Sequence, residues 1–161
     1  MSRAPKTVST EDLARMLKEN AEEYLSGEEI AERLGVSRTA VWNHIQELRV
    51  LGYDIEAVPH RGYRLSGLPE RLLPDEIKDG LKAKRFGKRI TVYEKLDSTN
   101  DTAMQAAQSG APEGTAIFAE TQSKGRGRLG RQWHSPRGKG LWFSIVLRPD
   151  LPMASAPRIT L

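Results

Sequence analysis

The chain has 161 residues, enough for one domain or two small ones, with a formal net charge of +4. Hydrophobic residues make up 38% and charged residues 29%, and cysteine is absent, which excludes disulfides and thiolate metal sites. No apolar run approaches the ~20 residues that a membrane-spanning helix needs. The chain starts without an apolar signal segment, so we expect a cytoplasmic protein without a membrane partner. The three histidines are far apart in sequence, and we predict no metal site.

Residues 10–52 show three helical patterns in succession. Apolar positions from Leu13 to Leu25 follow a helical stripe. Ser26 with Glu29 predicts a capping box at the start of a second, short helix, which Gly35 ends. Ser37 is the expected cap of a third helix that Gly52 closes. Two short helices joined by a glycine-containing turn are typical of a helix-turn-helix.

A hairpin follows the third helix directly. Tyr53 to Val58 alternates as a strand, residues 59–62 form a turn, and Tyr63 to Leu65 returns. We therefore interpret residues 1–66 as a winged helix-turn-helix DNA-binding domain. The candidate DNA contacts are the polar and aromatic residues of the third helix and wing: Arg38, Thr39, Trp42, Asn43, Gln46, Arg49 and Arg61.

The charge distribution favours DNA contact through the third helix and the wing. Residues 10–32 hold eight acidic and two basic residues, while residues 37–65 hold four basic and three acidic ones. Residues 1–66 are net −2, so non-specific attraction to DNA is small and we predict weak binding by a monomer. A winged helix that makes protein contacts, or none, is the alternative.

Turn residues in 67–74 predict a linker, and residues 75–161 carry mixed elements. We expect a short helix over 75–81, strands at 89–93, 115–120 and 141–147, and a helix over 101–108. The overall fold class is α+β, with short helices laid against a largely antiparallel sheet.

A run of glycine and arginine, Gly125 to Arg131, stands out in this second part. Between Thr121 and Pro149 there is no acidic residue, and there are seven basic ones. Glycine lets the backbone approach a ligand, and arginine grips phosphate or carboxylate in two places. The run matches G-x-G-x-x-G, but no buried strand precedes it and no helical pattern follows, so it is not a dinucleotide fingerprint. We predict a loop that orders around a small polyanion or a nucleic acid; a mobile solvated loop is the alternative.

With these motifs in this order, the chain resembles the bifunctional biotin protein ligases that repress the biotin operon. The resemblance rests on the helix-turn-helix and wing, the Asp97-Ser98-Thr99-Asn100 element, Glu120 and Gln122, and the loop from Gly125 to Arg131 with Trp133. It implies that biotin and ATP, with Mg²⁺, give biotinyl-5′-AMP and pyrophosphate. The biotinyl group then passes to a lysine of the biotin carboxyl carrier protein. Operator DNA and a ligand-linked homodimer are the other implied partners.

The resemblance also implies roles for individual residues. The expected biotin-binding residues are neutral hydrogen-bonders and loop groups: Ser98, Thr99, Asn100, Gln122, Arg126, Gly127 and Arg128. Arg126 and Arg128 are the expected catalytic residues, which stabilise charge on the carboxylate and α-phosphate. Gly125, Gly130, Arg131 and Trp133 complete the expected adenylate loop. From the residues alone, Ser98 to Asn100 would be a helix cap. For Trp133, a core role is an equal alternative to packing over the ligand.

The resemblance further implies that Leu161 lies inside the catalytic domain, part-way along a helix that begins near Ala154. In the family, a lysine segment and a small barrel follow. We therefore expect residues 75–161 to be a partial biotin- and adenylate-binding domain that is not catalytically competent alone. The alternative function is a non-catalytic winged-helix regulator that responds to an adenylate.

Overall fold

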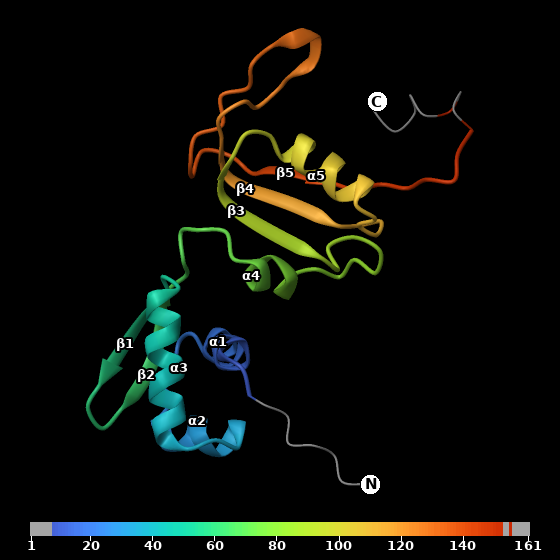
Figure 1. Ribbon diagram of the computed structural model, residues 1–161. Coiled ribbons are helices and arrows are strands. Elements are labelled where there is room, and N and C mark those ends of the chain that lie inside the picture. Colours follow the sequence, from blue (N-terminus) through green and yellow to red (C-terminus); the bar gives the residue numbers. More distant parts are fainter. Residues whose placement is uncertain (1–7, 153–154, 156–161) are drawn as a thin grey trace, which may run out of the picture. The chain divides into compact units, whose positions relative to one another are not determined.

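The structure is a computed structural model that describes residues 8–152 and residue 155. The chain divides into two compact units, and the boundary between Arg71 and Leu72 lies inside the segment 67–74 (Figure 1). The helix expected from residue 154 onward lies outside the described residues.

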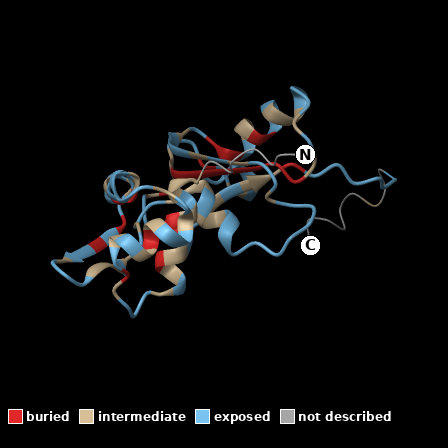
Figure 2. Cartoon of the chain, turned by 90° about the horizontal axis from the view of Figure 1, so that it is seen from below, coloured by how far each residue is buried: buried red, intermediate tan, exposed pale blue. Residues whose placement is uncertain are grey.

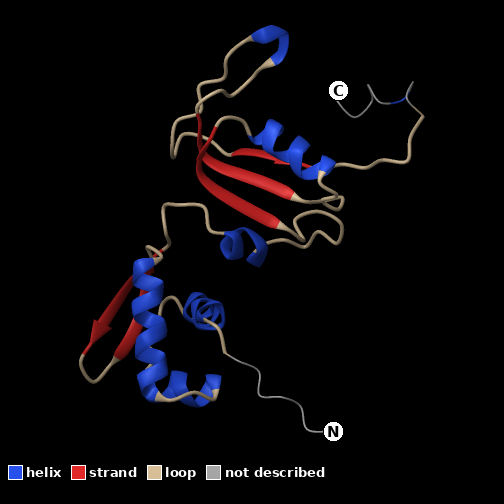
Figure 3. Ribbon diagram, viewed as in Figure 1, coloured by secondary structure: helices blue, strands red, loops and turns tan. Residues whose placement is uncertain are grey.

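The N-terminal unit contains α1 (Thr10–Glu19), α2 (Gly27–Leu34), α3 (Arg38–Val50), β1 (Asp54–Val58) and β2 (Gly62–Gly67). The strands form an antiparallel hairpin beside α3 (Figure 3). The three helices pack together through their apolar sides. The largest fully buried side chains are Leu13, Leu17, Ile30, Val41, Ile45 and Leu48. Figure 2 shows buried stretches in red alternating with exposed stretches in pale blue along the chain. The expected winged helix-turn-helix is therefore present.

Local capping chemistry sets where these helices begin and end. The Ser37 hydroxyl accepts the Ala40 N–H, and Gly35 ends α2 in the left-handed conformation, both as predicted. The capping box predicted at Ser26 is only half formed, because the Glu29 carboxylate pairs with Arg33 at 2.5 Å. The complete box lies instead at the start of α1, where Ser9 and Asp12 cap each other.

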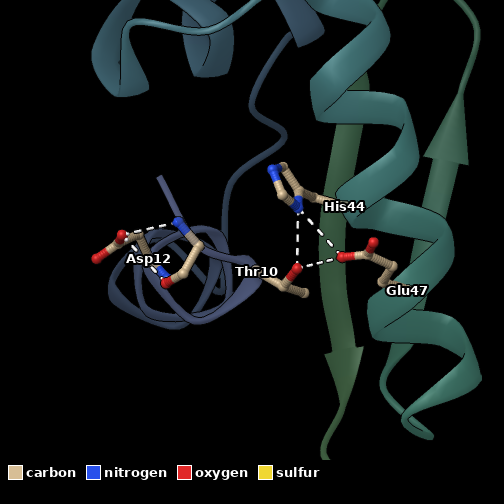
Figure 4. A network of polar contacts seen from close by, with 5 residues as sticks. Thr10, Asp12, His44 and Glu47 are labelled. Atoms are coloured by element: carbon tan, nitrogen blue, oxygen red, sulfur yellow. Dashed lines mark hydrogen bonds and ion pairs between the residues drawn. The ribbon is translucent and has the colours of Figure 1, made fainter. Parts of the chain in front are cut away.

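A polar cluster joins the first turn of α1 to the middle of α3 (Figure 4). The Thr10 hydroxyl lies 2.8 Å from His44 Nδ1 and donates to the Glu47 carboxylate. His44 Nδ1 is itself 3.2 Å from Glu47. The Thr10 hydroxyl, and next the His44 ring, hold the pKa of Glu47 below its ordinary value of 4.5.

The C-terminal unit contains α4 (Pro74–Asp79), β3 (Ile90–Leu96), α5 (Thr99–Gln108), β4 (Ala116–Gln122), a 3₁₀ turn (Arg128–Gly130) and β5 (Trp142–Ile145). The sheet order is β3-β4-β5, and α5 packs on one face over a core of Ala103, Ile117 and Val146. Figure 1 shows α5 lying along the sheet.

The sheet differs from the largely antiparallel one that the sequence suggested. β4 and β5 are antiparallel, but β3 and β4 are parallel. The reason is α5, which crosses over between β3 and β4 and returns the chain to the same end of the sheet. The α+β class with a mixed sheet stands. None of the helices in the described part of the chain has both the length and the apolar character that crossing a bilayer requires.

Candidate functional sites

The end of β4 and the start of α5 form a buried polar cluster. α5 begins where the Ser98 hydroxyl accepts the Asp101 N–H at 3.4 Å, so Ser98 has the helix-capping role that its sequence context favours. Gln122, the last residue of β4, accepts the Thr99 N–H at 2.7 Å and the Thr99 hydroxyl at 3.1 Å. Its amide Nε2 donates to the Ser135 hydroxyl at 3.0 Å. The cluster therefore fixes the base of the segment between Gln122 and Ser135.

That segment is a hairpin-like loop, seen in Figure 3 as the long excursion that carries a short helical turn. Gln122 pairs with Ser135 at its base, and the Trp133 N–H donates to the Gly125 carbonyl at 2.7 Å. A Cβ at position 125 would lie 2.8 Å from the Trp133 carbonyl oxygen, so only glycine fits there without displacement. The Gly/Arg run thus belongs to a loop with a closed base.

The cations of this loop differ in their surroundings. Lys124 pairs with Asp97 at 2.7 Å, and Arg126 pairs with Asp101 in the first turn of α5. The Lys124 ammonium, followed by the Ser123 hydroxyl, holds the pKa of Asp97 below its ordinary value of 3.8. Arg128 and Arg131 have no ion pair within the described residues, and they are exposed.

The tip of the loop is hollowed and faces solvent. An open hollow of about 690 Å³ is lined by Gly127, Arg128, Leu129, Arg131, Gln132, Trp133 and His134. Trp133 is exposed and meets Trp142 edge to face, with ring centroids 6.4 Å apart. It is therefore no core residue of the described unit, unlike the alternative considered from sequence. The arrangement offers two unpaired guanidinium groups and an aromatic face to one anionic ligand.

Three of the seven predicted biotin-binding residues, Arg126, Gly127 and Arg128, belong to the loop, and the other four fall into two groups. Ser98, Thr99 and Gln122 come together in the buried cluster, whereas Asn100 is exposed on α5. Sequence reasoning missed Ser135, which is 4% exposed and completes the cluster, and Asp101, which pairs with Arg126. No local pattern marks either residue, because both contacts join segments more than ten residues apart.

Glu120 is the one buried carboxylate of β4, with 7% of its surface exposed. It accepts the Leu72 N–H at 2.6 Å, and its other oxygen lies 4.0 Å from Arg137. Arg137 also pairs with Glu94 of β3 at 3.3 Å. Glu120 thus connects the segment that enters this unit to the segment that leaves the loop. Within the described residues, no three His, Asp or Glu side chains group as metal ligands.

In the N-terminal unit, a second candidate site lies between α3 and the wing. An open groove of about 760 Å³ is lined by Arg38, Thr39 and Trp42 from α3 and by residues 57–63 of the hairpin, Arg61 among them. Trp42 is 54% exposed there. Residues 26–28 complete the groove, although none of them is among the DNA contacts predicted from sequence.

The other predicted DNA contacts lie elsewhere on α3. Asn43 is exposed but does not line the groove, and Gln46 lines a separate hollow with Thr10 and Glu47. The Arg49 guanidinium donates to the Ile55 carbonyl at 2.8 Å, which fixes the end of α3 to β1. Four of the seven predicted contacts are therefore brought together.

Comparison with known proteins finds a match for each of the two units. Residues 9–64 match the family described as HTH domain, and residues 92–160 match the biotin/lipoate A/B protein ligase family. The "Bifunctional ligase/repressor BirA" of Bacillus subtilis is 46% identical over 150 residues, which are 93% of this chain and 46% of that protein.

The chain is thus similar to the bifunctional ligase/repressors over most of its own length, and its residues 92–160 are similar to the biotin/lipoate ligase family. The Escherichia coli ligase/repressor of the same name is 37% identical over 139 residues, 86% of this chain and 42% of that protein. The chain thus spans about half the length of the curated relatives it matches. A solved structure, "Biotin protein ligase from Aquifex aeolicus in complex with biotin and ATP", is 42% identical with a TM-score of 0.32, over 37% of this chain and 24% of that one.

Proposed function

We propose that the protein carrying this chain is a biotin protein ligase that also represses transcription. In the first step the biotin carboxylate oxygen attacks the α-phosphorus of ATP, and pyrophosphate leaves. In the second, a lysine amine of the biotin carboxyl carrier protein attacks the acyl carbon, and AMP leaves. Mg²⁺ enters with the phosphates of ATP. The observation that carries the proposal is the neutral cluster of Thr99, Gln122 and Ser135 at the base of a loop rich in cations.

The neutral cluster suits the uncharged ureido ring of biotin. Gln122 Nε2 carries two N–H groups, and Ser135 takes up one of them, which leaves a donor for a ureido carbonyl. Ser98 caps α5 and Thr99 accepts from Ser144 at 2.9 Å, so both also hold the cluster in shape. Asn100, exposed beside them, contributes a further amide. Polar groups that are held in place in this way orient a ligand at low entropic cost.

The loop cations suit the charged end of the ligand. Arg128 and Arg131 are exposed and unpaired in the described part of the chain, so their charge is available to a carboxylate or α-phosphate. Arg126 becomes available when it leaves Asp101. Together with Gly125, Gly127 and Gly130 they would surround the acyl phosphate, with Trp133 over the ligand. Catalysis is then electrostatic, since no side chain here acts as a nucleophile.

The winged helix is the repressor part of the proposal. Arg38, Thr39 and Trp42 on α3 and Arg61 on the wing line one groove, which is how such units present a helix to the major groove of DNA. A single unit with little net charge binds weakly, and a ligand-linked homodimer would let two units bind two half-sites of an operator. A cytoplasmic location follows from this function.

Removal of one loop cation tests the ligase proposal. Arg128→Ala should release biotinyl-5′-AMP about 10- to 150-fold faster, the loss expected for a hydrogen bond to a charged group. Lys139→Ala removes a cation from the same acid-free segment and is the matched control, for which release should stay as in the wild type. Release is followed by isotope trapping, and carrier labelling by mass spectrometry.

The outcomes separate ligase from regulator. Labelling of a carrier lysine by the protein that contains this chain supports the ligase, whereas adenylate binding without labelling supports a non-catalytic regulator. Equal release from Arg128→Ala and the wild type would remove the loop from adenylate binding. In a gel shift, operator binding should strengthen with biotinyl-5′-AMP and with protein concentration, and tight ligand-independent binding by a monomer would contradict dimerisation.

A further inference from the structure

We infer that Tyr24 is a positioning residue for DNA binding, because its ring holds Arg61 of the wing in place for a DNA phosphate. The inference rests on the proposed DNA-binding function and adds a residue outside α3 and the wing. The Arg61 guanidinium carbon lies 4.2 Å from the centroid of the Tyr24 ring. That distance is well within the ~6 Å at which a cation is attracted to an aromatic face.

Tyr24 is attached to the wing by the backbone. It lies in the segment between α1 and α2, and the next residue, Leu25, exchanges two backbone hydrogen bonds with Tyr63 at 2.9 and 2.8 Å. Gly62 permits this approach, since a Cβ there would lie 2.1 Å from the Leu25 carbonyl oxygen. The segment is thus joined to the hairpin by an antiparallel β-bridge, and the ring of Tyr24 keeps a fixed position relative to the wing turn.

The charges around Tyr24 distinguish the two arginines that share its ring. Arg64 lies 4.7 Å from the ring centroid and pairs with Glu56 at 2.8 Å. The Tyr24 hydroxyl donates to the same carboxylate at 2.7 Å. Glu56 therefore neutralises Arg64 and fixes the Tyr24 ring. Arg61 has no ion pair within the described residues.

A neutral aromatic face holds a guanidinium without cancelling its charge. Arg61 consequently meets DNA as a full cation with a restricted side chain, whereas Arg64 is already compensated. Arg61 also lines the groove that contains Arg38 and Trp42, so its position relative to α3 matters for simultaneous contact with one duplex. A long side chain that is ordered before binding loses less rotamer entropy when the complex forms.

The test measures binding of the full chain to a fluorescein-labelled DNA duplex of mixed sequence by anisotropy, at several salt concentrations. Phosphate contacts are independent of sequence, so the operator is not needed. Arg61→Ala should reduce the steepness of log K against log salt by about 0.9, the value for one phosphate contact. Arg64→Ala is the matched control from the same wing and should leave the slope unchanged.

Tyr24→Leu should leave the salt slope unchanged, since Arg61 keeps its charge, and weaken binding by about 2- to 5-fold, which corresponds to one exposed cation–π contact. Tyr24→Phe keeps the ring but loses its hydrogen bond to Glu56, so it should weaken binding less than Tyr24→Leu does. In the Arg61→Ala background, Tyr24→Leu should have no further effect. An equal loss in both backgrounds would show that Tyr24 acts through the fold alone and would overturn the inference.

A second measurement does not depend on the stability of a variant. In the DNA-free wild-type protein, the δ protons of Arg61 should show a ring-current shift in NMR spectra, and its absence would equally overturn the inference. If the wild type binds no duplex DNA at low salt, the proposed repressor function fails and the inference with it. If the wild type binds and the double-mutant cycle is additive, only the role of Tyr24 fails.

Discussion

Gly125→Ala tests whether the base of the basic loop is as closely packed as the structure shows. The new methyl carbon would lie 2.8 Å from the Trp133 carbonyl oxygen and 2.9 Å from the Ser135 hydroxyl. Ordinary van der Waals contact begins near 3.4 Å, so one of these groups has to move by about half an ångström. The Trp133 oxygen is backbone, and the same residue donates its N–H to Gly125 at 2.7 Å. The base therefore cannot open on one side without loss of this hydrogen bond.

Such overpacking typically costs about 1–3 kcal/mol. For a unit of this size each kcal/mol lowers the melting temperature by about 4–8 °C. Gly127→Ala is the matched control, because a Cβ there meets Arg131 only at ordinary distances of 3.4–4.0 Å. Differential scanning calorimetry of the full chain should show the loss in the C-terminal unit for Gly125→Ala alone. Equal melting temperatures for the two variants would refute the close packing of the base.

Three further variants test the acids around the two sites. Asp101→Asn frees Arg126, so biotinyl-5′-AMP should bind up to about 5-fold more tightly in isothermal titration, which is the scale of one exposed ion pair. Weaker binding would contradict the proposal that Arg126 leaves Asp101 for the ligand. Glu120→Ala leaves the Leu72 N–H unpaired and should destabilise the C-terminal unit by about 1–3 kcal/mol in calorimetry, whereas Glu120→Gln keeps an acceptor and should cost less. Folding lowers the pKa of Glu47, so its stabilising effect should be complete above pH 4.5 and disappear as the pH falls through the lowered value. Denaturant titrations would refute this if the free energies of unfolding of Glu47→Gln and the wild type differed by the same amount at every pH.

Local chemistry made much of the fold predictable. Ser37 and Gly35 mark helix ends through their own side-chain and backbone preferences, and the apolar stripe of α3 identifies its buried face. The parallel pairing of β3 with β4 was missed, because strand direction depends on how α5 packs and not on the strand sequences. The half-formed box at Ser26 was missed for a similar reason, since Arg33 competes for Glu29.

The sequence indicates what kind of ligand each candidate site suits, but not which individual contacts form there. An acid-free run of glycine and arginine indicates an anion site wherever it folds, so Arg128 and Arg131 could be named from sequence. Asp101 could not, because its pairing with Arg126 joins residues 25 positions apart. Arg49 was named as a DNA contact because it lies on α3, yet helix position alone does not show that its guanidinium binds the Ile55 carbonyl.

The base and the tip of the basic loop differ in packing, and each suits a different part of the proposed function. The base must keep the loop near the neutral cluster, and Gly125, Gln122 and Ser135 achieve this through close packing and hydrogen bonds. In the proposed function the tip must reach a ligand. There Leu129 is 93% exposed with a φ of 59°, a left-handed conformation that a leucine rarely adopts. A tip with few contacts can rearrange at little cost, while the anchored base limits where it goes. Closure over a bound adenylate would then bring Arg128 to the acyl phosphate and replace a solvent-exposed leucine with a packed one, so that ligand binding and loop ordering favour each other.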